Sequence, residues 1–188
     1  MRFKIKRRLL YLAFGAAAFL IAYSAGAAVP MTNEEAAQVR RDFMDQIGGI
    51  DQNGIFFNNV RIALAMFIPA AGAALGMFSG FATGNVFSAI ANASPALSRI
   101  PPLAILITPF GILEVIAYGI AMSRSGMLIF RLVKDKPWRQ GNGRPFFHNT
   151  LVPTFIEIGI VAAILLAGAV IEWQLIQQLG GLGNSLGA

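Results

Sequence analysis

Long apolar runs separated by short polar segments dominate the sequence. The clear runs cover residues 9–29, 56–78, 101–122 and 150–173, and a less regular apolar stretch at 81–100 lies between the second and third of them. Each clear run is close to the roughly 20 residues that an α-helix needs to cross the hydrocarbon core of a bilayer. The pattern therefore predicts an all-α fold, a polytopic transmembrane helical bundle.

A basic segment precedes the first run, and small residues follow it. A secretory signal peptide has the same order of basic, apolar and small residues, and residues 25–27 resemble a cleavage site. The run at 9–29 is longer than the apolar part of a usual signal peptide, however, and matches the length of a bilayer crossing. We therefore expect residues 1–30 to form a basic N-terminal segment and a retained first transmembrane helix.

The segment at 31–54 is polar and mixed in charge. Thr32 and Glu35 have the spacing of a helix N-cap with an acid three positions later, and apolar residues recur at helical spacing from Val39 onward. Such a helix has one apolar face, which can lie on a membrane surface or against a partner. We predict an amphipathic helix outside the cytoplasm, followed by a loop.

Positively charged residues form two clusters, and these clusters determine the expected topology. Five of the 15 Lys and Arg residues precede the first run, and six more lie between residues 124 and 144. Short cytoplasmic loops are enriched in Lys and Arg, so we expect the N-terminus and a basic loop at 123–149 in the cytoplasm. The two clusters share one side of the membrane only if the chain crosses it an even number of times between them.

An additional crossing at 81–100 satisfies this condition. Gly84 and Asn85 interrupt this stretch, and irregular backbone at membrane depth must be surrounded by protein or by a water-filled cavity. We predict a bundle at 55–174 with five spans, the third of them short, broken and interior, and an extracytoplasmic C-terminus with a flexible tail at 175–188. The alternative, four spans with a re-entrant loop, would put the second basic cluster on the other side of the membrane.

The composition excludes several classes of protein. Charged residues make up only 13% of the chain and the mean hydropathy is +0.63, whereas soluble domains have about 25% charged residues. The net charge of +6 lies in separate clusters rather than along one accessible face, so we do not expect a nucleic-acid partner. The expected location is the cell membrane. The expected partners are the lipid bilayer and other integral membrane subunits, in a hetero-complex or a homo-oligomer.

Residues that carry chemistry are scarce. The chain has no cysteine, which excludes disulfides and thiolate metal sites. Its single histidine, His148, follows the basic loop, where a lone histidine is more often an ordinary hydrogen-bonding residue than a catalyst or a ligand. Phosphate-binding loops, nucleophile elbows and metalloprotease motifs are also absent from the sequence. We therefore predict no catalytic residue, no metal, no cofactor and no enzyme activity.

Ionisable residues inside the apolar runs need partners, because a charge near the bilayer centre costs about 2.5–3.5 kcal/mol on insertion scales. Glu114 lies near the middle of its run, and Arg61 lies just inside another run, after Asn58 and Asn59. Our hypothesis is that Glu114 faces these residues across a helix interface, either ionised and paired or protonated and hydrogen-bonded. 

Two further acids, Glu157 and Glu172, lie near the two ends of the last run. Glu114 and Glu157 could form a proton or cation path, or each acid could satisfy a neighbouring helix. We favour the second interpretation, because two acids without a third acid or a histidine make a poor relay.

Three glycines, Gly72, Gly76 and Gly80, recur every four residues in the second run. Small residues at this spacing let another helix approach closely. Packing within the bundle is the simplest role for them.

The region from Ile55 to Trp173 resembles the stage II sporulation protein M family. The resemblance depends on the segments IFFNNVRIAL, Gly84-Asn85, PFGILEVIAYGIAMSRSG and AGAVIEW, in that order. The positions that match the family pattern are Asn58, Asn59, Gly84, Asn85, Pro109, Gly111, Glu114, Ile171 and Glu172. Phe110 departs from the pattern, because the family commonly has histidine there.

The resemblance implies a polytopic membrane protein with a scaffolding or accessory role. Phe110 cannot pair with an acid or take a proton as the histidine of the family could, which favours a structural role for this segment. The sequence therefore predicts a membrane scaffold, assembly factor or accessory subunit of a larger membrane complex. The alternative is a small transporter or channel component that uses Glu114 and Glu157.

Overall fold

The computed structural model describes residues 2–47, 50–92, 101–135 and 146–186. These residues are almost entirely helical, as the apolar pattern predicts. The elements in chain order are α1 (Arg2–Ala27), α2 (Asn33–Ile47), α3 (Gln52–Ala65), α4 (Gly72–Asn92), the 3-10 helix η1 (Pro102–Ile107), α5 (Pro109–Asp135), the π-helix η2 (Phe147–Leu151) and α7 (Val152–Leu186).

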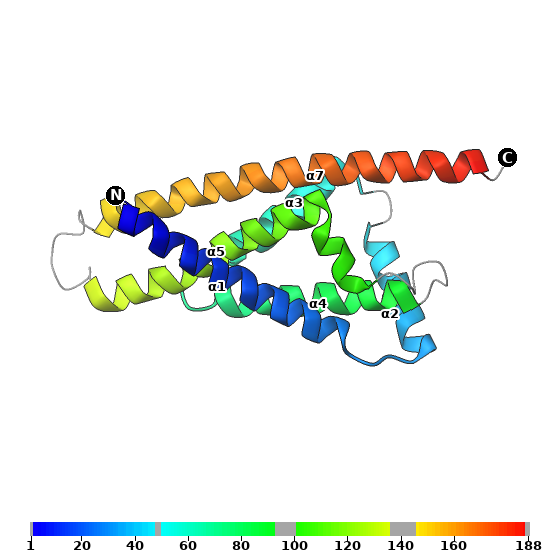
Figure 1. Ribbon diagram of the computed structural model, residues 1–188, viewed down its shortest axis with the longest axis horizontal. Helices are drawn as coiled ribbons and strands as arrows, with labels where there is room; N and C mark the ends of the chain where they lie inside the picture. The colour runs from blue at the N-terminus through cyan, green and yellow to red at the C-terminus, as the bar shows by residue number, and fades with distance from the viewer. Residues whose placement is uncertain (1, 48–49, 93–100, 136–145, 187–188) are drawn as a thin grey trace.

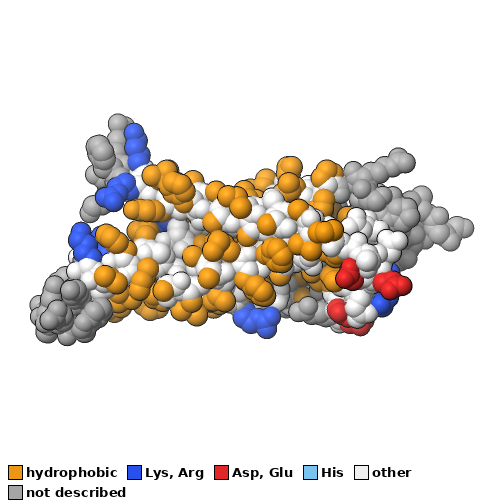
Figure 2. All heavy atoms as spheres, turned by 90° about the horizontal axis from the view of Figure 1, so that it is seen from below, with side chains coloured by type: hydrophobic (Ala, Val, Ile, Leu, Met, Phe, Trp, Pro, Cys, Tyr) orange, Lys and Arg blue, Asp and Glu red, His pale blue; other side chains and the backbone are white. Residues whose placement is uncertain are grey.

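The long helices run roughly along one axis of an elongated molecule (Figure 1). The N-terminus, the end of α5 and the start of α7 lie at one end, and α2 and the C-terminus lie toward the other. Figure 2 shows hydrophobic side chains over the middle of the visible face, several Lys and Arg side chains at the first end, a basic side chain at the lower edge, and acidic and basic side chains together toward the other end. We call these two ends the basic end and the α2 end.

Four helices are long and apolar enough to cross a membrane. Among the described residues these segments are Lys6–Ala27, Gly72–Asn92, Pro109–Lys134 and Phe147–Gln178, in α1, in α4, in α5 and across η2 and α7. This finding confirms the predicted all-helical fold in the described residues and shows four candidate membrane-spanning helices.

The run at 56–78 does not form the single helix that the sequence pattern predicts. α3 ends at Ala65, and the chain turns through residues 66–71 before α4 begins. Pro69 explains this break, because its ring disfavours helical backbone at the preceding residue and it has no N–H for the helical hydrogen bonds. Ala70 adopts a φ of 67°, in the left-handed region, and so completes the turn.

The stretch at 81–100 was predicted to be short and broken, and this is wrong for the part that the structure describes. Residues 81–92 are regular helix at the C-terminal end of α4, and residues 93–100 lie outside the described residues. Gly84 does not interrupt this helix. It faces α1, where a β-carbon would overlap the carbonyl oxygen of Tyr23. The short element is therefore α3, and the helix after it is of full length.

α5 and α7 extend beyond their predicted boundaries. α5 begins at Pro109 rather than at residue 101 and continues to Asp135, so the first part of the predicted loop at 123–149 is helical; residues 136–145 lie outside the described residues. α7 continues to Leu186, so residues 175–186 form helix rather than a flexible tail. Once a helix has formed, each added residue gains a hydrogen bond at little cost, which favours such continuation.

The glycines of α4 lie on its buried face. A β-carbon on Gly80 would lie 2.9 Å from the carbonyl oxygen of Phe19 in α1, and a β-carbon on Gly76 would overlap the side chain of Met122 in α5. Gly72 lies against Met66 and Ser125 in the same way. The close approach that these glycines permit therefore occurs within one chain, between α4 and its neighbours α1 and α5.

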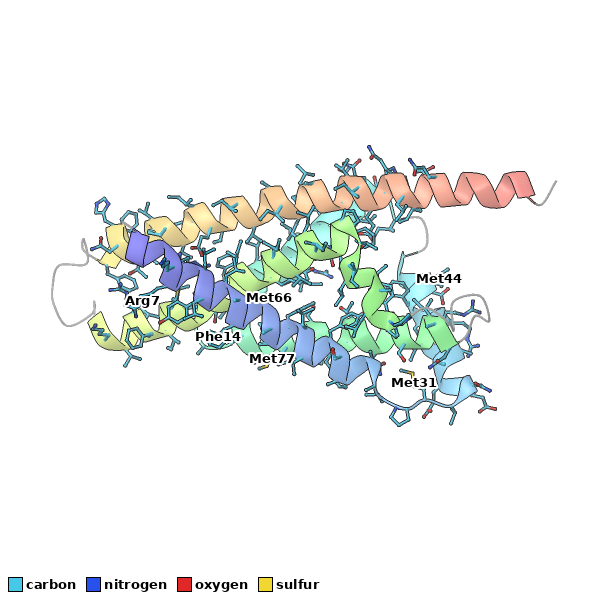
Figure 3. The ribbon with its side chains drawn as sticks, viewed as in Figure 1. Arg7, Phe14, Met31, Met44, Met66 and Met77 are labelled. Atoms are coloured by element: carbon cyan, nitrogen blue, oxygen red, sulfur yellow. The ribbon has the colours of Figure 1, made fainter. Side chains whose placement is uncertain are left out.

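The hydrophobic core lies between α1, α3, α5 and α7. It includes Phe19, Met66, Tyr118 and Leu165, all of which are buried. The rings of Phe19 and Tyr118 pack with their centroids 5.3 Å apart, which is a favourable separation for an aromatic pair. Met66, labelled in Figure 3, is the residue at which α3 gives way to the turn.

α2 begins with the capping arrangement that the sequence predicts. The Thr32 N–H donates to the Glu35 carboxylate at 2.8 Å, and the Glu35 N–H donates to the Thr32 hydroxyl at 3.3 Å. The hydrogen bonds from the Thr32 N–H and, second, from the Thr32 hydroxyl lower the pKa of Glu35. These bonds satisfy backbone groups that the first turn of a helix would otherwise leave exposed.

Candidate functional site

The first candidate site is a buried cluster of charges near the basic end, formed by Arg8, Arg124 and Glu157. Arg8 of α1 donates to Glu157 of α7 from Nε and from a terminal nitrogen, each at 2.7 Å. Arg124 of α5 donates to both oxygens of the same carboxylate. The cluster thus joins three helices through one carboxylate. We call it the Arg-Glu-Arg triad.

The triad is well hydrogen-bonded but unequal in charge. The side chains of Arg8, Arg124 and Glu157 are 22%, 7% and 15% exposed. Arg8 also donates to the Ser123 hydroxyl at 2.7 Å and to the Ile120 carbonyl at 3.1 Å, so its guanidinium has further acceptors. Two guanidiniums share one carboxylate, however, and this leaves a formal surplus of one positive charge in the cluster.

Sequence reasoning identified only one member of the triad. Glu157 satisfies neighbouring helices, in line with the structural interpretation of this acid. Arg8 and Arg124 were assigned to the N-terminal basic cluster and to the basic loop. Their position at the borders of apolar runs was a signal that they could turn into the bundle.

The second polar cluster lies toward the α2 end, where Asn59 of α3 donates to the carboxylate of Glu114 in α5. Glu172 of α7 is close enough to Glu114 for an electrostatic interaction. Glu157 and Glu172 are 15 positions apart on one helix, which corresponds to about 22 Å at 1.5 Å per residue. The two polar clusters therefore lie near opposite edges of an apolar band that is about 22 Å thick, thinner than the roughly 30 Å of a hydrocarbon core.

The pairing expected for Glu114 is present for Asn59 but not for Arg61. Arg61 is exposed and donates to Asn58 of its own helix at 3.1 Å. Asn58 in turn donates weakly to Asn59, at 3.5 Å. Arg61 follows Asn59 by two positions, and this spacing places the two side chains on different faces of a helix.

The residues that resemble the family pattern near Pro109 shape the start of α5. The Thr108 hydroxyl accepts a hydrogen bond from the Gly111 N–H at 3.1 Å, and a β-carbon on Gly111 would overlap the carbonyl oxygen of Ile105. Phe110 is buried. This segment therefore joins η1 tightly to α5. Asn85 and Ile171, at the other family-like positions, are half-buried.

A third feature is an open cleft at the basic end, between α1, α5 and the start of α7, with a volume of about 1090 Å³. Figure 3 shows Arg7 closer than Phe14 to the basic end, and both residues line the cleft. His148 is exposed and also lines it. We call this feature the basic cleft. The lining residues are Arg7, Arg8, Tyr11, Phe14, Gly15, Ala18, Ala73, Met122, Ser123, Gly126, Met127, Phe130, Arg131, His148, Asn149 and Pro153.

In the part of the chain that the structure describes, no three His, Asp or Glu side chains come together as a metal site. Comparison with protein-family models, with curated proteins and with solved structures finds no match to this chain. The resemblance to the stage II sporulation protein M family therefore stays a prediction from the sequence segments alone.

Substitution of Glu114 separates the role of its charge from that of its hydrogen bond. Glu114→Gln keeps an oxygen that accepts from Asn59, so we expect its free energy of unfolding to stay within about 1 kcal/mol of the parent. Glu114→Ala leaves the Asn59 amide without its acceptor, and we expect a loss of about 1–3 kcal/mol. Unfolding of the purified chain in detergent measures both. Equal losses for the two variants would show that the carboxylate itself is required.

Proposed function

We propose that this protein is a membrane scaffold or accessory subunit that holds other integral membrane subunits and performs no chemistry of its own. The observation that carries the proposal is the outward face of α3. Phe57, Arg61 and Leu64 recur at helical spacing and are all exposed. We call these three residues the α3 stripe.

The charge of Arg61 is what distinguishes this stripe from an ordinary lipid-facing surface. Ionisable residues within membrane segments almost always face a bundle interior or a water-filled cavity. Arg61 faces outward from its own chain and donates a hydrogen bond to Asn58 of the same helix. A second subunit with a carboxylate or free carbonyl oxygens at the same depth would satisfy the guanidinium. The α3 stripe thus fits the interior of a larger assembly.

Photo-crosslinking in the native membrane tests this proposal. A photoreactive residue at Phe57 is expected to give a discrete protein adduct that is lost when Arg61→Leu is added. The same photoreactive residue at Ile160, which is exposed on α7, is the control and should give lipid adducts. The adduct partner should also copurify in a fixed ratio in mild detergent. Identical adducts from both positions, or an adduct that persists in Arg61→Leu, would contradict the proposal.

The topology that we propose has five passes, with α3 as the short one. The Ser125 hydroxyl of α5 donates to the Ile68 carbonyl at 2.6 Å, so the turn at 66–71 lies level with the neighbouring Arg124 of the triad. Because Asn59 of α3 lies in the other polar cluster, α3 and its turn extend from one edge of the apolar band to the other. With the basic end in the cytoplasm, α2 and the C-terminus lie outside.

Single cysteines in this cysteine-free chain test the topology, and four exposed positions suit the experiment. In intact cells, an impermeant thiol reagent should label Gln38→Cys and Asn92→Cys. Ala71→Cys and Lys134→Cys should react only after the membrane is permeabilised. Ser125 lies in the predicted cytoplasmic loop at 123–149, but it is fully buried, so a cysteine there would not react with the reagent from either side. Labelling of Ala71→Cys from outside would contradict a crossing by α3 and so the five-pass topology.

The second functional class, a small transporter or channel component, was expected to use Glu114 and Glu157. These two acids belong to different polar clusters, and core residues such as Phe19, Tyr118 and Leu165 fill the bundle between its helices. The geometry therefore supports the scaffold better. Flux through vesicles that contain the purified chain, abolished by Glu114→Ala, would favour the transporter instead.

A further inference from the structure

The basic cleft combines an apolar wall with positive charge at its mouth. Tyr11 and Phe14 of α1 and Met122 and Met127 of α5 contribute to the apolar wall, and Arg7 lies toward the basic end. With a volume of about 1090 Å³, the cleft is slightly larger than the usual range for small-molecule sites. An apolar channel of this size in a membrane helix bundle accommodates an extended acyl chain.

The positive charge around the cleft favours an anionic ligand. Arg8 of the Arg-Glu-Arg triad lines the cleft, and the triad has a formal surplus of one positive charge. Arg7 adds an exposed guanidinium. The described residues that line the cleft include no Asp or Glu. A ligand with a negative head and an apolar tail would complement both parts of the cleft.

We propose that the basic cleft binds one anionic phospholipid from the leaflet at the basic end. Its phosphate lies at Arg7 and near the surplus charge of the triad, and one acyl chain lies along Phe14 and Met127. Basic pockets between transmembrane helices at the cytoplasmic side are suited to such head groups. This inference is independent of the α3 stripe, which lies on a different helix.

Native mass spectrometry of the full-length chain in mild detergent tests the proposal. The two probes are dioleoylphosphatidylglycerol and dioleoylphosphatidylcholine, which have the same acyl chains and differ in head-group charge. We expect one molecule of the anionic lipid to bind about tenfold more tightly than the neutral one, since each basic residue near an anionic head group contributes severalfold in affinity. Equal binding of the two lipids would overturn the proposal.

Arg7→Gln tests the head-group end. It should weaken phosphatidylglycerol binding about fivefold and leave phosphatidylcholine binding unchanged. Lys6→Gln is the matched control, because Lys6 is exposed next to Arg7 in the same helix but does not line the cleft. An equal effect of the two substitutions would assign the preference to general surface charge and so contradict a built site.

Gly126→Phe tests the acyl-chain end. Gly126 lines the cleft and has open space where its β-carbon would lie, so a bulky side chain can be introduced there without a clash at its β-carbon. We expect at least a tenfold loss of phosphatidylglycerol binding, whereas Gly159→Phe, at a glycine of α7 that is equally open and lies outside the cleft, should bind like the parent. Unchanged binding by Gly126→Phe, or displacement of the lipid by millimolar inorganic phosphate alone, would overturn the proposal.

Discussion

Glu157→Gln is expected to lower the free energy of unfolding by about 3–5 kcal/mol, because it leaves the buried guanidinium of Arg124 and the half-buried one of Arg8 without a counter-charge. Arg8 and Arg124 come from different helices and both pair with this carboxylate. Without it, their mutual repulsion acts directly on the contacts between α1, α5 and α7. Unfolding of the purified chain in a detergent of increasing denaturing strength gives the difference.

Two controls make this result specific. Glu34→Gln removes an exposed acid in the first turn of α2 and should change the free energy of unfolding by no more than about 0.5 kcal/mol. A triple variant with methionine at positions 8, 124 and 157 should recover much of the loss, because apolar residues often replace a buried ion cluster without penalty. A Glu157→Gln protein as stable as the parent would show that the triad does not hold the helices together.

Gly26→Ala and Gly84→Ala are expected to separate α1 from α4. A β-carbon on Gly26 would overlap the backbone of Phe81, and one on Gly84 would overlap the backbone of Tyr23. Backbone atoms cannot rotate away, so the helices must move apart and lose packing. We expect each substitution to destabilise by about 1–3 kcal/mol or more. Thermal unfolding in detergent, with the same protein concentration for every variant, measures the loss.

The double variant and a matched glycine sharpen this prediction. Once one methyl group has moved the helices apart, the second has more room, so Gly26→Ala with Gly84→Ala should cost less than the sum of the single losses. Gly159 has nothing within 4 Å of a β-carbon, so Gly159→Ala should be neutral or stabilise by up to about 1 kcal/mol. A loss in Gly159→Ala equal to that in Gly84→Ala would indicate a general effect of glycine replacement.

The positions of α1, α5 and α7 could be predicted from the sequence, because a bilayer demands apolar runs of similar length. The position of α4, which lies across two of the predicted runs, and the boundaries of the helices could not be predicted. Pro69 lies inside an apolar run, and hydropathy alone does not register that its ring ends a helix. Gly84 and Asn85 suggested irregular backbone, yet Gly84 lies within a regular helix because α1 packs directly over it. Local composition does not tell whether a glycine breaks a helix or brings two helices together.

The polar clusters were harder to predict than the helices. Arg8 and Glu157 are 149 positions apart in the chain, and Arg124 and Glu157 are 33 apart. Such pairs follow from the arrangement of the bundle, which no local pattern contains. The contact between Asn59 and Glu114 was expected because both lie inside apolar runs, where each needs a partner. The same argument predicted a buried partner for Arg61, but Arg61 faces outward. The position of a residue within an apolar run does not determine which face of the helix it lies on.

The brevity of α3 has a consequence for how the chain enters the bilayer. Its 14 residues extend about 21 Å at 1.5 Å per residue, short of the roughly 30 Å of the hydrocarbon core. Arg61 adds a further insertion cost of about 2.5–3.5 kcal/mol if it reaches the centre. On its own, α3 would therefore move poorly from the translocon into the lipid bilayer. In the topology that we propose, α3 is therefore inserted together with α4 as a helical hairpin, with the turn at Pro69 leading.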